Sequence, residues 1–213
     1  MFDFTFLRHG ESTGNVDRII QGQSDCPLTE KGFQQAQALA GSWAAQAKTF
    51  DLIITSSLAR ARQTAEIIAG ALHTPLEVDP VWIERSFGQL EGLLLAEIDK
   101  IQPPIDYYHP YLAIGATGES QTDLYLRASR AIQGLLRRQP GRYLIVSHGA
   151  MLNKVFYAIF GITPAGHYNS PVFPLGNMAF ASTSYNPETR QWLFHSLVNQ
   201  PVDHPVYSKF VKE

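Results

Sequence analysis

The chain has 213 residues, of which 45% are hydrophobic and 17% charged, which predicts one packed globular domain and excludes a disordered chain. Its formal net charge of -2 gives no strong field for nucleic acid or an anionic membrane, and we expect neither as a partner. A single cysteine, Cys26, excludes an internal disulfide. Without a signal-peptide pattern or an apolar run long enough to span a bilayer, we expect a cytoplasmic protein.

The first predicted element is a short strand over residues 4–7, which ends in Arg8, His9 and Gly10. In open α/β sheets the carboxyl edge of the strands is where ligands bind, and a glycine there lets the backbone turn sharply. The strand therefore presents two nitrogen-rich side chains at a potential binding edge. A surface turn with an incidental histidine is the alternative for this stretch taken alone.

Two helices and a strand follow a polar loop. Residues 29–47 carry apolar side chains at helical spacing, with Thr29 as the N-cap. Residues 51–56 form a short apolar run that is typical of a buried parallel strand. The next helix is predicted to begin at Ser56 or Ser57 as its cap.

Arg60 lies in the first turn of that second helix. A cation at this position opposes the helix macrodipole, which favours a bound anion nearby. The alternative is a solvated arginine with a small electrostatic penalty.

A short strand at residues 76–78 and a structured loop at residues 82–92 come next. The segment from about residue 91 to 118 is predicted to form a cap over the carboxyl edge of the sheet, with a helix at about residues 94–101. Its aromatic patch, which either packs internally or walls a pocket, comprises Tyr107, Tyr108, His109, Pro110 and Tyr111.

The capping-box pattern at residues 120–123 starts a helix that Pro140 and Gly141 end. A second buried strand at residues 143–147 then leads into His148 and a helix over residues 150–160.

Residues 177–185 and 191–198 are predicted to form a hairpin around an Asn186-Pro187 turn. We expect no regular structure in the tail, residues 199–213. The alternation of strands and helices predicts an α/β fold, a three-layer α/β/α sandwich with a mostly parallel central sheet.

In such a sheet His9, His148 and Arg60, together with Arg8, emerge at one edge. This cluster of cationic and imidazole groups suits a dianionic phosphoryl group, because arginine offers paired planar donors to its oxygens. A neutral imidazole can attack phosphorus and carry the group as a phosphohistidine. A second histidine can donate to the oxygens whose charge shifts in the transition state.

The leaving alkoxide needs a proton, which arginine does not supply. Glu84 and Glu91 in the structured loop are the two candidate acids. Burial or a bound dianion favours the protonated form of a carboxyl group that faces it.

Several motifs together resemble the histidine phosphatase superfamily, in its phosphoglycerate mutase-like branch. They run in family order over about residues 4 to 180: RHGExxxN at residues 8–15, the loop at 21–29, SxLxRAxxTA at 57–65, the acid loop at 84–92 and SHG at 147–149.

The resemblance implies a single domain over residues 1–213 with the phosphoglycerate mutase-like fold. It further implies that His9 is the phosphorylated nucleophile, Glu84 the proton donor, and Glu91 a structural residue that pairs with Arg85 or a backbone amide. It also implies that His148 takes part in catalysis. The phosphoryl group would be held by Arg8, Asn15, Arg60 and His148, and the pocket lined by Gln21 and Gly22.

Mutases of this family hold a second phosphate with a lysine and an arginine pair in the insertion. This chain has Lys100 but no Arg-Arg pair between Glu91 and Ser120, and its insertion is aromatic and aliphatic. We therefore predict a metal-independent phosphatase without a cofactor that acts on a small phosphorylated metabolite. Residues 115–120 read GATGES where phosphatase relatives show PGGES, which affects the cap conformation.

Three alternatives stay open: a phosphoglycerate mutase-type phosphotransferase, a non-catalytic phospho-ligand binding module, and a metal site at His9 and His148. No carboxylate cluster or His-x-x-x-His spacing supports the metal site. Neither the substrate nor the oligomeric state is readable, and a homodimer through the hairpin and tail is one arrangement to consider.

Overall fold

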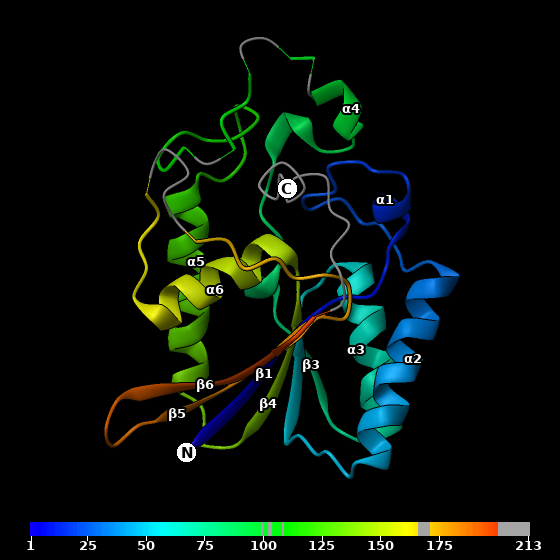
Figure 1. The fold of residues 1–213 in the computed structure, drawn as a ribbon, viewed down its shortest axis with the longest axis vertical. Coiled ribbons are helices and arrows are strands. Elements are labelled where there is room, and N and C mark those ends of the chain that lie inside the picture. The colour runs from blue at the N-terminus through cyan, green and yellow to red at the C-terminus, as the bar shows by residue number, and fades with distance from the viewer. Residues whose placement is uncertain (99, 102–103, 108, 166–170, 200–213) are drawn as a thin grey trace, which may run out of the picture.

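One twisted sheet runs through the computed structural model, which describes residues 1–98, 100–101, 104–107, 109–165 and 171–199 (Figure 1). Within these residues the sheet has six strands in the order β3-β2-β4-β1-β5-β6. The four strands from β3 to β1 are parallel, whereas β5 and β6 pair antiparallel, so the mostly parallel sheet is confirmed. The bounds are β1 (Phe2–Arg8), β2 (Leu52–Thr55), β3 (Leu76–Val78), β4 (Arg142–Ser147), β5 (Phe180–Asn186) and β6 (Gln191–Val198).

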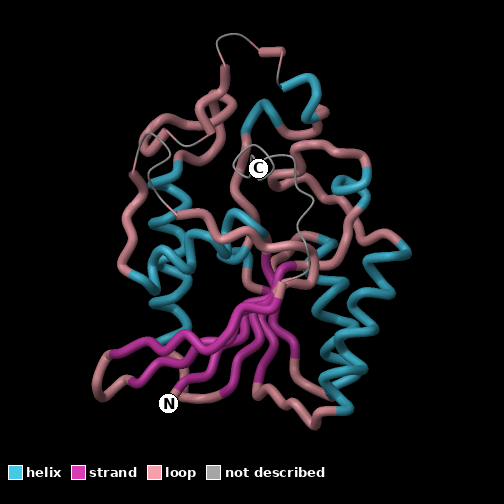
Figure 2. The backbone as a smooth tube through the Cα atoms, in the orientation of Figure 1, coloured by secondary structure: helices cyan, strands magenta, loops and turns pink. Residues whose placement is uncertain are grey.

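Helices cover both faces of the sheet, as the predicted three layers require (Figures 1 and 2). On one face lie α2 (Glu30–Ala45) and α3 (Ala59–Leu72), and on the other lie α5 (Gln121–Leu136) and α6 (Gly149–Phe160). Shorter elements are α1 (Thr13–Val16), α4 (Leu95–Ile98) and the 3-10 helices η1 (Pro80–Trp82) and η2 (Gly88–Leu90).

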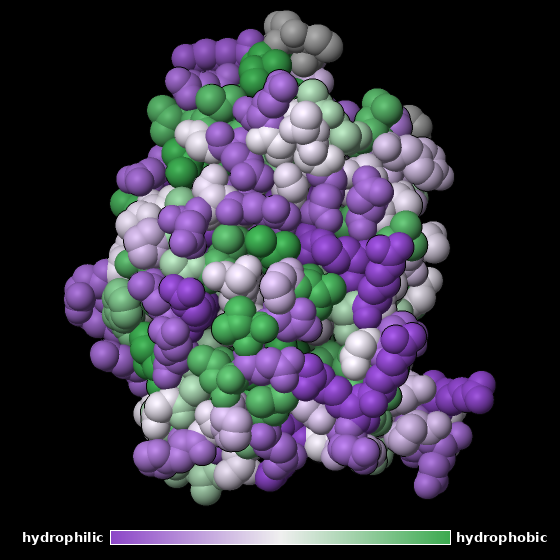
Figure 3. Space-filling model, turned by 180° about the vertical axis from the view of Figure 1, so that it is seen from behind, coloured by the Kyte–Doolittle hydropathy of each residue, from purple (hydrophilic) through white to green (hydrophobic). Residues whose placement is uncertain are grey.

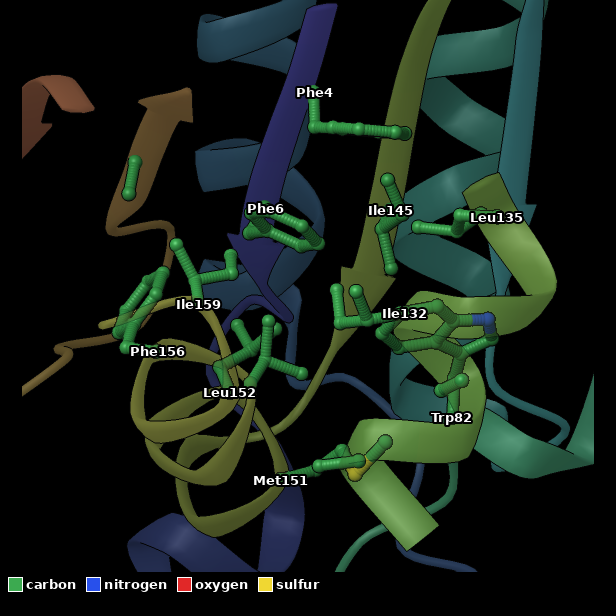
Figure 4. Packing of buried hydrophobic residues seen from close by; sticks show 14 of the residues in the cluster. Phe4, Phe6, Trp82, Ile132, Leu135, Ile145, Met151, Leu152, Phe156 and Ile159 are labelled. Atoms are coloured by element: carbon green, nitrogen blue, oxygen red, sulfur yellow. The ribbon is translucent and has the colours of Figure 1, made fainter. Parts of the chain in front are cut away.

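Successive side chains along each strand point to opposite faces of the sheet, and they form two hydrophobic cores. Phe4 and Phe6 of β1 and Ile145 of β4 pack against α5 and α6, as Figure 4 shows. Leu7 of β1 and Val146 of β4 point to the opposite face and pack with α2 and α3. The period of two along each strand thus buries both faces, which is why these strands read as nearly continuous apolar runs.

Side-chain caps begin two of the helices as predicted. Thr29 accepts a hydrogen bond from Gly32 N at 3.0 Å, and Ser120 forms a capping box with Asp123. The predicted cap of α3 is wrong, because its N-cap residue is Leu58. Ser56 Oγ still accepts from Leu58 N at 3.3 Å, and the same hydroxyl contacts His148.

The segment from residue 91 to 118 is less regular than predicted. Its helix spans only Leu95–Ile98 rather than about residues 94–101, and the preceding loop contains η1 and η2. In Figure 1 the segment lies above the carboxyl ends of the parallel strands, beyond α1. Its apolar side chains Ile98 and Ile114 pack with Ile20 and Leu90 in a small third cluster.

The surface shown in Figure 3 mixes hydrophobic and hydrophilic side chains in small groups. Among the described residues, no helix combines the length and the apolar character that crossing a bilayer requires. Tyr108 of the aromatic patch and residues 200–213 of the tail lie outside the described residues, so the expectations for them stay untested.

Candidate active site

His9 follows β1 directly and is only 3% exposed. Its Nδ1 donates to Gly10 O at 2.7 Å, because a carbonyl can only accept, which leaves the Nε2 lone pair available. Burial, and next the positive charges of Arg60 and Arg8, hold the pKa of His9 well below its usual range. The ring is therefore neutral at pH 7, which is the form that a nucleophile needs.

The turn after His9 is fixed by close backbone contacts. Gly10 N donates to Thr64 Oγ1 at 3.1 Å. A Cβ at Gly10 would lie 2.8 Å from the carbonyl oxygen of Gly32, so only glycine fits where this turn meets the first turn of α2. These contacts hold the backbone beside the His9 ring in place.

Arg8 and Arg60 place two guanidinium groups at the same edge of the sheet. Arg60 is 1% exposed and donates to Gly22 O and Ser24 O, each at 2.8 Å. Its Nε is buried without a hydrogen-bond partner among the described residues, whereas the Arg8 side chain donates to Leu175 O. Two buried cations beside two neutral imidazoles form a strongly positive centre that suits an anion.

His148 follows β4, the neighbour of β1, and its ring centroid lies 5.1 Å from that of His9. Its Nε2 hydrogen-bonds Ser56 Oγ at 2.8 Å, and its Nδ1 is buried without a partner among the described residues. Burial, then the charge of Arg60, lowers the pKa of His148 well below its usual range. The ring is fully buried, and the cavity wall at this point is formed by the next residues, Gly149 and Ala150.

Glu84 brings a carboxylate to the amino-terminal end of α6. One oxygen accepts from Arg85 N at 2.8 Å and Met151 N at 3.0 Å, and the other from Ala150 N at 3.2 Å. Free amide groups at a helix N-terminus hold the oxygens of a carboxyl group in this way. Glu84 lines the same cavity as His9.

Arg127 of α5 holds the backbone of the Glu84 loop. Its guanidinium donates to the carbonyl oxygens of Val81, Ile83 and Glu84, at 3.0, 2.6 and 3.0 Å. It also forms a two-point ion pair with Glu119, at 2.7 and 2.8 Å. This planar fork fixes the position from which the Glu84 side chain projects.

Helix α1 and the loop after it contribute the other predicted site residues. Asn15 Oδ1 accepts from Ser12 N at 3.0 Å, Gln21 Oε1 accepts from Ser12 Oγ at 2.8 Å, and both residues line the cavity. Gly22 lines it as well and has φ +48°, and a Cβ there would lie 2.3 Å from Glu91 Oε1. Glu91 in turn accepts from Phe87 N at 2.9 Å, so of its two predicted partners the structure has the backbone amide.

The centre opens into a cavity of about 1070 Å³. One wall is formed by the loop residues described above, and another by Ala150, Asn153, Lys154 and Tyr157 of α6. Tyr107 lines it too. Among the residues that the structure describes, no group of three or more His, Cys, Asp or Glu side chains is placed to hold a metal ion.

The model of the histidine phosphatase superfamily (branch 1) matches residues 4–198. This chain belongs to the histidine phosphatase superfamily. A Yersinia pestis protein named "Probable phosphoglycerate mutase GpmB" is 36% identical over 169 residues, which cover 76% of each chain.

Several solved structures of similar fold carry phosphatase names. A mycobacterial glucosyl-3-phosphoglycerate phosphatase superposes with a TM-score of 0.79 at 25% identity, covering 92% of this chain and 98% of that one. A phosphoserine phosphatase from Entamoeba histolytica with bound phosphoserine has a TM-score of 0.75 at 25% identity, with 92% and 96% covered. Bacillus stearothermophilus YhfR has a TM-score of 0.79 at 29% identity, with 91% and 95% covered.

The sequence interpretation missed three residues near this histidine phosphatase centre. Ser56 was assigned only a cap, although its hydroxyl contacts His148. Arg127 carries no motif signal, because its contacts span more than 40 residues of chain. Lys154 had a usable signal, since it is the one charged residue in the otherwise mostly apolar helix α6.

Proposed function

We propose that this chain is a phosphomonoesterase that forms a phosphohistidine at His9 and then transfers the phosphoryl group to water. The observation that carries the proposal is the state of His9: a buried neutral ring with Nδ1 bonded to Gly10 O, in a cavity that also holds Arg8 and Arg60. A nucleophilic nitrogen and positive groups for the phosphoryl oxygens thus lie together.

In the first step, His9 Nε2 attacks phosphorus and the bond from phosphorus to the ester oxygen breaks. Glu84 gives its proton to the leaving alcohol oxygen. In the second step a water molecule attacks phosphorus, gives a proton to Glu84 and displaces His9, so that inorganic phosphate leaves. Arg8, Arg60, His148 and Asn15 stabilise the phosphoryl oxygens in both steps, and none of these transfers needs a metal ion.

Water is the proposed acceptor because the insertion offers little to hold a second phosphate. Lys100 is exposed and is not among the residues that line the cavity. The names of the 36% identical relatives favour a second candidate, a phosphoglycerate mutase-type phosphotransferase. A small phosphorylated metabolite is the proposed substrate in either case.

The test is a panel of phosphomonoesters, read as phosphate released by the purified enzyme with and without a chelator. Brief reaction with a ³²P-labelled ester, then quenching, should trap a label that is stable in base and lost in acid, as expected of phosphohistidine. His9→Ala should abolish both label and turnover. His195→Ala, which removes a histidine on β6 that contacts Ser184, should keep both.

Two results would overturn the hydrolase proposal. Interconversion of 2- and 3-phosphoglycerate much faster than phosphate release would establish the mutase. Turnover no better than that of His9→Ala on every ester, with retained phosphate binding, would indicate a binding module.

A further inference from the structure

Two faces of helix α6 have different roles. Met151, Leu152 and Phe156 on the first face pack into the hydrophobic core between α6 and the sheet, as Figure 4 shows. The second face, which lines the cavity, consists of Ala150, Asn153, Lys154 and Tyr157. Its spacing of three, one and three residues is that of one continuous helix surface. The cavity side of α6 is therefore built from a defined stripe that includes one cation.

Lys154 is a buried cation that has no anionic partner among the described residues. It is 7% exposed, and its Nζ lies 3.8 Å from the ring centroid of Tyr157. No carboxylate among the described residues forms an ion pair with it. Burial and then the charge of Arg85 lower its pKa to about 7. Leaving a charge buried in this way destabilises the free protein, a cost that proteins carry mainly at functional sites.

The position of Lys154 relates it to the leaving alcohol. Ala150 N donates to Glu84, the proposed proton donor for the ester oxygen. Lys154 follows Ala150 by four residues on the same face, about 6 Å farther along the helix axis. A group bound at Lys154 therefore belongs to the alcohol part of the substrate, on the side of the centre where Glu84 acts.

We propose that Lys154 binds a carboxylate on the alcohol part of the substrate, so that the enzyme prefers phosphate monoesters of hydroxy acids; this rests on the proposed phosphatase function. Lys154 supplies one positive charge, and the aromatic ring beside it supplies none, so the subsite matches a ligand group with a single negative charge. The neighbouring cation, Arg85, already donates to the backbone oxygens of Glu119 and Tyr107, so this subsite is matched to a monoanion and not to a second phosphate.

The experiment compares two esters that differ only in this group, 3-phosphoglycerate and glycerol 1-phosphate. The wild type should favour the acid, and Lys154→Met should lower kcat/KM for 3-phosphoglycerate by about 10- to 100-fold. The same variant should change kcat/KM for glycerol 1-phosphate less than 3-fold. Most of the loss should appear in KM, since a binding contact distant from phosphorus acts on both ground and transition states.

Lys48→Met is the matched control. Lys48 also lies over an aromatic ring, 4.4 Å from the centroid of Trp43, but it does not line the cavity. Lys48→Met should leave the ratio of kcat/KM for the two esters unchanged. Equal loss on both esters in Lys154→Met, or no preference for the acid in the wild type, would overturn the carboxylate site. Absence of His9-dependent turnover on every ester of the panel would instead overturn the phosphatase function itself.

The pH dependence of the ratio gives a second readout. Above pH 7 Lys154 loses its proton, so the preference for the acid should fall, approaching tenfold per pH unit. The other charged or ionisable groups that line the cavity act on both esters alike, as does the phosphate itself; they are Arg8, His9, Glu11, Arg18, Lys31, Arg60, Glu84, Arg85, Tyr107 and Tyr157. Lys154→Met should show a flat ratio, and an unchanged slope in that variant would contradict the assignment.

Discussion

The reaction centre and the wall of the cavity differ in how they are held. His9 and His148 follow adjacent parallel strands, and Arg60 follows the next strand in the sheet, so the sheet itself brings them together. The residues of the cavity wall are not brought together by the strand ends of the sheet. The wall uses one face of α6 and a segment around Tyr107. The helix α4 of that segment is one turn long, and a small apolar cluster packs it.

We expect from this difference that the reaction centre determines the rate of the chemical step, and that the wall of the cavity determines which substrate is preferred. Changes at the centre should lower turnover of every ester, because each of them needs the same phosphorus geometry. Changes in the wall should reorder substrates and leave a small generic ester nearly unaffected. Variants that violate this division would show that the two regions are coupled.

The largest effect should come from Glu84→Gln, which keeps the shape of the side chain and removes the proton. With alkyl phosphates, whose leaving alkoxide is a strong base, kcat should fall by about 10²–10⁴-fold. With p-nitrophenyl phosphate, whose leaving group needs no proton, the loss should be below about 10-fold. Initial rates on a series of leaving groups measure this, and equal losses across the series would remove Glu84 from the role of acid.

Arg127→Ala should show the same dependence on the leaving group, but the effect should be smaller. We expect kcat on alkyl phosphates to fall by about 10- to 100-fold. The reason is that the Glu84 backbone loses the guanidinium that fixes it. Arg130→Ala, on the same helix and outside the active-site cavity, is the matched control. A uniform loss on all esters in Arg127→Ala would mean that it supports the fold and not the acid.

The sequence predicted the parts of this design that local patterns encode. Apolar runs identified β2 and β4, capping residues identified the starts of α2 and α5, and the strand–His–Gly pattern located both histidines. Each of these depends on neighbours within a few residues. The cap of α3 was wrong because Ser56, a good local candidate, contacts His148 from another strand.

Contacts between distant segments account for most of what was missed. The clamp between Arg127 and the Glu84 loop, and the packing of Gly22 against Glu91, join residues that the chain brings together only once the sheet has formed. The reach of the predicted helix at residues 94–101 was also overestimated, because its apolar residues pack with Ile20 and Leu90 instead of continuing a helical face.

Acid should destabilise the free enzyme through the two histidines of the centre. Both have a pKa well below the usual value when folded and one of about 6.5 when unfolded. The stabilisation that depends on these two histidines is thus complete above pH 6.5 and falls below it, because the unfolded chain binds protons there that the folded chain does not. At pH 5.5 each histidine should lower the free energy of unfolding by an amount on the order of 1 kcal/mol.

Urea unfolding at pH 7.5 and 5.5 measures this loss. The double variant His9→Asn, His148→Asn should lose markedly less stability between these pH values than the wild type, whereas His195→Asn should lose as much. The carboxylates with lowered pKa, Glu11, Asp51, Glu77 and Asp123, titrate in a more acidic range and do not confuse the comparison. A wild-type stability that is flat over this range would mean that the two rings accept protons in the folded state.

The smallest effect should separate the two described tyrosines of the aromatic patch. Tyr107 lines the cavity, whereas Tyr111 is absent from its lining and is exposed. Tyr107→Ala should therefore reorder a panel of esters by a few-fold while p-nitrophenyl phosphate turnover is largely kept, and Tyr111→Ala should leave the order unchanged. If neither substitution alters the ranking, selection resides in α6 alone; if Tyr111→Ala alters it, the wall extends beyond the cavity seen here.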